Sequence, residues 1–92
     1  MLLIPPVSNR DHLRGNPSAI IELVEYGDFQ CSFSGLAYPI IKSIQARFGD
    51  KLKFVFRHFP LTRSHPHAKL AAIASEAAAK QGKFWEMHDI LF

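Results

Sequence analysis

Apolar residues recur along the chain first with a strand period, then with a helix period, and then with a strand period again. Residues 20–26 are rich in aliphatic and β-branched side chains, and a Gly-Asp pair follows them, which predicts a strand. Apolar side chains at spacings of three and four predict an amphipathic helix over residues 35–48. Residues 51–59 predict a second strand, which a proline ends. This order predicts a parallel βαβ unit with a right-handed crossover, and therefore an α/β fold.

The segments on either side of this unit differ in character. Residues 68–80 form an alanine-rich helical pattern that begins just after a proline, and a further helical pattern runs from residue 83 to 92. Residues 1–18 are rich in proline, asparagine, aspartate, arginine and glycine, which predicts an extended N-terminal arm or linker. We therefore divide the chain into an arm over residues 1–18 and one domain over residues 19–92.

The composition is that of one small folded domain. The 92 residues are too few for two independent cores, and 48% hydrophobic with 21% charged content favours a packed core over disorder. The net charge of +3 comes from basic residues spread along the chain, so we expect no nucleic-acid partner. The apolar runs are shorter than the ~20 residues that span a bilayer, and the first residues form no signal-peptide pattern. We therefore expect no membrane insertion by this chain and, as written, a cytoplasmic location.

Cys31 is the only cysteine of the sequence, which excludes an intrachain disulfide. It lies in a short loop between the first predicted strand and the first predicted helix. The free N–H groups and the dipole of a helix N-terminus stabilise an anion, so this position favours the reactive thiolate. A lone cysteine is otherwise a small buried apolar residue, but the loop position favours a redox thiol here.

Several short segments resemble the DsbA-like thioredoxin-fold thiol–disulfide oxidoreductases. Residues 25–39 read EYGDFQCSFSGLAYP and resemble the active-site stretch of that family, which includes thioredoxin-like domains fused to sodium/proton antiporters. Residues 56–61 (FRHFPL), 65–68 (HPHA) and 82–89 (GKFWEMHD) resemble its second strand and insertion helices. The resemblance implies a partial thioredoxin-like fold, with a parallel βαβ unit followed by helices of the DsbA-type helical insertion. This corresponds to the N-terminal half of such a domain.

The resemblance assigns an active-site motif to Cys31, Ser32, Phe33 and Ser34. Cys31 corresponds to the nucleophilic thiol, whereas Ser34 stands where the family has its resolving cysteine. Exchange proceeds through a mixed disulfide, so a missing second thiol removes the intramolecular release step. We therefore expect a monothiol mechanism without a cofactor, in which glutathione as co-substrate or a partner protein thiol resolves the intermediate.

Glu25 lies six residues before Cys31, where thioredoxin relatives keep a buried carboxylate. In the strand period it shares a face with Ile21 and Leu23, which agrees with burial. A buried acid has a raised pKa and can exchange a proton with a leaving thiolate. The resemblance therefore implies a catalytic role for Glu25. The alternative is an ordinary strand-end glutamate in solvent.

Other functions stay open, because Ser34 replaces a thiol and because no cis-proline loop of the DsbA type occurs before Phe92. One is a redox-inactive interaction domain or a truncated fragment. Another is a glutathione-binding domain of the thioredoxin fold, which uses a Ser or Cys at this helix end. The exposed edges of a small parallel sheet also predict self-association into a homo-oligomer. The compartment stays open too, because relatives are often periplasmic or membrane-tethered.

Histidines are the remaining candidates for chemistry, at five positions: His12, His58, His65, His67 and His88. Pro66 separates two of them, and neither a second cysteine nor a His-Glu-x-x-His pattern accompanies them. We therefore predict no metal ligands and interpret the histidines as surface or structural residues.

Overall fold

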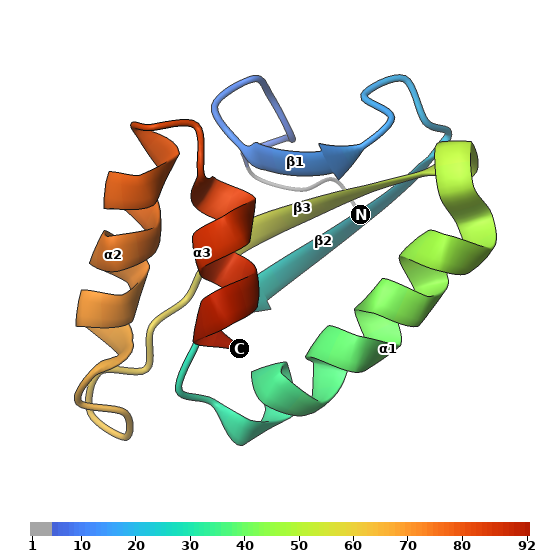
Figure 1. Ribbon diagram of the computed structural model, residues 1–92. Coiled ribbons are helices and arrows are strands. Elements are labelled where there is room, and N and C mark those ends of the chain that lie inside the picture. Colours follow the sequence, from blue (N-terminus) through green and yellow to red (C-terminus); the bar gives the residue numbers. More distant parts are fainter. Residues whose placement is uncertain (1–4) are drawn as a thin grey trace.

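The computed structural model describes residues 5–92 and has a sheet covered by helices, which confirms the α/β prediction (Figure 1). In chain order the elements are β1 (His12–Gly15), β2 (Ile21–Gly27), α1 (Ser32–Phe48), the 3-10 helix η1 (Gly49–Lys51), β3 (Leu52–His58), α2 (Ala68–Ala79) and α3 (Phe84–Leu91). Every strand and helix predicted from the hydrophobic pattern is present. The largest difference is at the start of α1, which begins at Ser32 instead of residue 35.

The sheet has the strand order β1-β3-β2, so β3 is central. β2 and β3 pair in parallel from Ile21 opposite Leu52 to Gly27 opposite His58, as the βαβ prediction requires. Within the described residues, β2 has no strand partner on its outer side. An open edge of this kind is what led us to expect self-association, which stays a prediction.

The N-terminal arm contributes a strand, which the sequence pattern did not predict. β1 pairs with β3 in the antiparallel sense, with His12 opposite Phe56 and Gly15 opposite Lys53. The four residues of β1 have no alternating apolar pattern, and they are extended because the free edge of β3 supplies backbone hydrogen-bond partners. Residues 1–4 of the predicted arm lie outside the described residues.

The core lies on one face of the sheet, where the side chains of β3 meet α1 and α3. Leu52, Phe54 and Phe56 of β3 are almost fully buried together with Phe84 of α3. Partly buried residues of β2, α1 and α3 surround them, namely Leu23, Ile41, Ile44 and Trp85. Figure 1 shows α1 and α3 in front of the sheet, with α2 beside α3. Every second residue of β3 therefore points into the core, as expected for a strand that is covered on this face.

α1 is the longest helix and connects the two parallel strands. It continues through Pro39, and the hydroxyl of Ser43 donates to the Pro39 carbonyl oxygen at 3.2 Å. Although Ile41 and Ile44 face the core, α1 exposes Phe33, Leu36 and Ile40. Among residues 5–92, the structure contains no helix with both the length and the apolar content needed to cross a membrane.

An ion pair fastens α3 to β1. Both Arg14 guanidinium nitrogens contact the Asp89 carboxylate, at 2.9 and 3.2 Å, and the guanidinium lies 4.5 Å from the centre of the Trp85 ring. The indole N–H of Trp85 donates to the Leu13 carbonyl oxygen at 3.1 Å. Burial alone raises the pKa of Asp89, but the bonds from Arg14 and His88 dominate and lower it from 3.8 to about 2. The ionised carboxylate therefore stabilises the folded state.

Asp89→Asn should lower the free energy of unfolding by about 2 kcal/mol at pH 7, because a carboxyl with a depressed pKa stabilises the fold only while it is ionised. This contribution is complete above about pH 4 and disappears as the pH falls through about 2. Urea denaturation of the unchanged chain and of Asp89→Asn between pH 7 and pH 2 measures this contribution.

Glu86→Gln is the matched control, because the pair of Glu86 with Lys83 lies on the exposed side of the same helix at 3.6 Å. This variant should lose less than about 0.5 kcal/mol. A loss for Asp89→Asn that stays constant down to pH 2 would contradict the electrostatic explanation.

Candidate active site

Cys31 is the N-cap residue of α1 and ends the loop that follows β2. Its carbonyl oxygen accepts the N–H of Gly35 at 3.0 Å, which closes the first turn of the helix. Its own N–H donates to the carbonyl oxygen of Asp28 at 3.0 Å. The side chain is partly exposed. The thiol therefore lies at the N-terminus of a 17-residue helix and within reach of solvent.

Asp28 is buried and determines the shape of the loop. Its carboxylate accepts the backbone N–H groups of Gln30 at 2.8 Å and Leu61 at 3.0 Å, and it contacts Nδ1 of His65 at 2.7 Å. Burial alone raises the pKa of this carboxyl, but the bonds from Leu61, His65 and Gln30 together hold it below its ordinary value. The charged carboxylate thus joins the loop before Cys31 to the segment that follows β3.

Further hydrogen bonds hold the same two segments together. The side-chain oxygen of Gln30 accepts the N–H of His67 at 2.6 Å, and the N–H of Phe59 donates to the Gly27 carbonyl oxygen at 2.8 Å. The loop that leads to Cys31 is thereby held against the segment that follows β3.

Ser34 takes part in this loop through its hydroxyl oxygen, which accepts the N–H of Asp28 at 3.2 Å. It therefore lies one helical turn beyond Cys31 and faces the same loop. Ser32 is exposed, and 80% of Phe33 is exposed. The motif thus presents one thiol, one engaged hydroxyl and an apolar ring that faces solvent.

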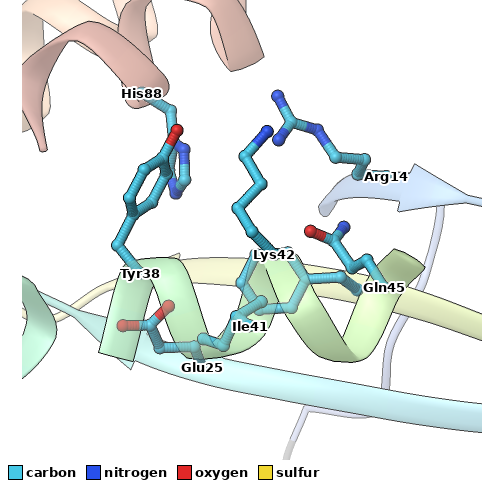
Figure 2. Close-up of a pocket in the computed structure, with 8 residues that line it drawn as sticks. Arg14, Glu25, Tyr38, Ile41, Lys42, Gln45 and His88 are labelled. Carbon is cyan, nitrogen blue, oxygen red and sulfur yellow. The ribbon is translucent and has the colours of Figure 1, made fainter. Parts of the chain in front are cut away.

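Glu25 lies on the core face of β2, opposite Phe56, as the strand period predicted. It lines a small, partly open cavity of about 10 Å³, room for about one water molecule, together with Tyr38, Lys42 and His88 (Figure 2). Burial raises the pKa of Glu25 above its ordinary value. The cavity lining includes neither Cys31 nor Ser34, so this cavity does not bring Glu25 together with them.

His88 is a buried residue that the sequence analysis grouped with surface or structural histidines. Only 3% of it is exposed, and its ring lies 4.8 Å from that of Phe56 and 6.0 Å from that of Tyr38. Burial lowers its pKa, although the bond to Asp89 opposes this shift. Within residues 5–92, its Nε2 is a buried polar atom without a hydrogen-bond partner. His88 is therefore a structural histidine and not a surface one.

The parallel βαβ unit with a cysteine at the N-terminus of its helix defines a thioredoxin-like domain with a thiol–disulfide oxidoreductase-like fold. Residues 8–92 match the protein-family model Thioredoxin_4, which is described as thioredoxin, and the chain belongs to this family. The solved DsbA structures of Wolbachia pipientis have the same fold. The Wolbachia alpha-DsbA1 C97A/C146A structure is 30% identical to this chain, with a TM-score of 0.76. The match covers 94% of this chain and 42% of the Wolbachia chain. Alpha-DsbA1 itself is 31% identical with a TM-score of 0.70.

Sequence relatives covering nearly the whole chain carry the name of an antiporter. The Na(+)/H(+) antiporter NhaA 1 of Mycolicibacterium gilvum is 56% identical over 91 residues, which is 99% of this chain. The protein of the same name from Salinispora arenicola is 48% identical over 90 residues. The chain spans 15% and 14% of the lengths of these two relatives. The resemblance stated from the active-site motif, including its antiporter-fused branch, is confirmed.

The residues that sequence reasoning missed lie in contacts between distant segments. Asp28 and His65 are 37 residues apart, so their spacing gives no indication that they meet. One local signal was available for Asp28, because an aspartate two residues before a loop N–H is typical of a side-chain-closed turn.

Asp28→Ala should loosen the loop before Cys31, because two backbone N–H groups and one imidazole lose a buried charged acceptor. We expect the amides of Gln30 and Leu61 to exchange hydrogen at least about ten times faster, and a loss of about 2–3 kcal/mol of stability. Amide exchange followed by NMR measures both.

Hydrogen exchange at the amide of Val55 distinguishes local opening of the loop from global unfolding. Val55 lies buried in the central strand, so its amide exchanges only when the whole domain unfolds. Asp50→Ala, which removes an exposed carboxylate, is the control. Equal exchange rates for Gln30 and Leu61 in Asp28→Ala and in the unchanged chain would disprove the proposed role of Asp28.

Proposed function

We propose that this domain carries out thiol–disulfide exchange through Cys31. The observation that supports the proposal most directly is the position of Cys31 as N-cap of α1, at the end of a loop held by Asp28. The free N–H groups of the helix lie at this end of α1, and partial exposure gives a disulfide of another molecule access to the sulfur.

The exchange takes two steps and needs no resident cofactor. The Cys31 thiolate attacks one sulfur of a protein disulfide, so that a mixed disulfide forms, the original S–S bond breaks and the released thiolate takes up a proton. Ser34 has no thiol to resolve this intermediate. A thiolate from glutathione or from another protein therefore attacks the mixed disulfide and releases Cys31. We accordingly propose a monothiol mechanism with protein thiols and disulfides as substrates.

We propose Glu25 as a proton reservoir for this site. It belongs to the strand that leads into the loop of Cys31, and burial raises its pKa, so that it holds a proton at a higher pH than an exposed glutamate does. The cavity beside it has room for one water molecule, which can exchange a proton with the carboxyl on the core side of α1. The thiolate released from the substrate disulfide is the group that would take up this proton.

Ser34→Cys should convert the monothiol chain into a dithiol one, because residue 34 lies one turn beyond Cys31 and faces the same loop. In insulin reduction with dithiothreitol, the variant should reduce disulfides at least about ten times faster than the unchanged chain. Without glutathione, the unchanged chain should stop at a mixed disulfide with one substrate molecule per chain, detectable by mass spectrometry.

Ser32→Cys is the matched control, because it adds a thiol to the same motif directly next to Cys31, where the peptide geometry disfavours a disulfide. It should leave the insulin rate near that of the unchanged chain. Mixed disulfides that fail to form in the unchanged chain, with Cys31 reduced and accessible, would refute the proposal and favour a redox-inactive interaction domain.

A further inference from the structure

Three potential metal ligands meet outside the thiol site, at the junction of β1, β3 and α2. His12 belongs to β1, His58 to β3 and Glu76 to α2. Nε2 of His12 lies 2.6 Å and Nε2 of His58 lies 2.9 Å from the same Glu76 oxygen, Oε2. All three potential ligand atoms lie within 4.8 Å of one another.

The two imidazole rings are held in position by packing. The His12 ring stacks on Phe84 with 3.6 Å between ring centres and 5° between ring planes. The His58 ring meets the edge of Phe56 at 5.4 Å and lies 5.9 Å from Phe29. Because the strands are neighbours in the sheet, their backbones also fix the separation of the two rings. Both Nε2 atoms therefore face the same point, the Glu76 Oε2 atom.

We propose that His12, His58 and Glu76 bind a divalent transition-metal ion, with Zn²⁺ as the ion that this donor set suits best. Two imidazole nitrogens and one carboxylate oxygen form a three-ligand zinc set, which a water completes to a tetrahedron. In such a site the ligand atoms are about 3.4 Å apart. The contacts of the two Nε2 atoms with Glu76 Oε2, at 2.6 and 2.9 Å, have to lengthen to about that value, and the Glu76 side chain, the most exposed of the three, can withdraw to allow it.

The protonation of the three ligands and the charges around them are compatible with a bound cation. The ionised Glu76 carboxylate only accepts, so each Nε2 is the donor in its bond to Glu76. To bind the ion, each imidazole gives up this Nε2 proton and, as the neutral form with its proton on Nδ1, offers the Nε2 lone pair in place of the bond to Glu76. Burial raises the pKa of Glu76, but the bonds from His58 and His12 hold it below its ordinary value, so the carboxylate is ionised at neutral pH. The nearby Arg57 is neutralised by Asp11, which it contacts at 2.7 and 2.9 Å.

An open groove gives ion and water access to this point. The groove has a volume of about 660 Å³, and its lining includes all three ligands together with Tyr26 and Arg57. Among the described residues, the cluster contains no cysteine, so metal binding there leaves Cys31 free for exchange. The bound ion would fasten the N-terminal strand and α2 to the central strand.

A zinc titration tests the site directly, with Cys31→Ser as the background so that the thiol cannot bind the ion. Competition between ZnCl₂ and a chromogenic chelator should show one equivalent bound with a Kd of about 10 µM or lower. Glu76→Gln and His58→Gln should each weaken binding at least tenfold. His67→Gln, which removes an exposed histidine outside the cluster, should leave the Kd unchanged.

Two further measurements guard against variants that are merely unfolded. Saturating Zn²⁺ should raise the midpoint of thermal unfolding by about 5 °C or more in the background chain and not in Glu76→Gln. Co²⁺ should give the visible absorption of a tetrahedral site in the same chain. Binding weaker than about 1 mM, or equal binding by folded Glu76→Gln, would overturn the proposal.

Discussion

The parallel pairing of β2 with β3 determines where the chemistry of this protein can lie. Parallel neighbours cannot be joined by a tight turn, so a helix has to cross over one face of the sheet between them. The crossover helix α1 begins just beyond the end of β2, and its first free N–H groups lie at that edge. Cys31 is the residue at this junction. The place of Cys31 at a helix N-terminus is therefore a consequence of the topology.

Two ionised carboxylates then join segments that lie far apart in the sequence. The Asp28 carboxylate joins the loop before Cys31 to the segment after β3, and the Arg14–Asp89 pair joins the first strand to the last helix. Both carboxylates are ionised because hydrogen bonds outweigh the cost of burial. The loop thus keeps its shape without a second cysteine, and Ser34 contributes a hydroxyl where thiol–disulfide exchange would use a thiol. The candidate site is therefore a loop held by hydrogen bonds around one thiol.

Local pattern was enough to predict the two parallel strands, the three helices and the position of Cys31, because burial of β3 and the stripe of α1 leave clear periodicities. β1 was missed, since four residues paired to an open edge need no apolar pattern of their own. The His12–Glu76 contact was also missed, because it joins residues 64 positions apart. Glu25 was correctly assigned to the core face by its strand period, but its neighbours Tyr38 and His88 depend on how α1 and α3 pack.

The rate at which Cys31 forms a mixed disulfide with oxidised glutathione at pH 7 tests the central claim most directly. The folded chain should react at least about ten times faster than the same chain unfolded in urea, because only the folded chain holds the thiol at the end of a fixed loop and within reach of solvent. Equal rates, or a slower reaction in the folded chain, would contradict the account of Cys31 as the nucleophile of thiol–disulfide exchange.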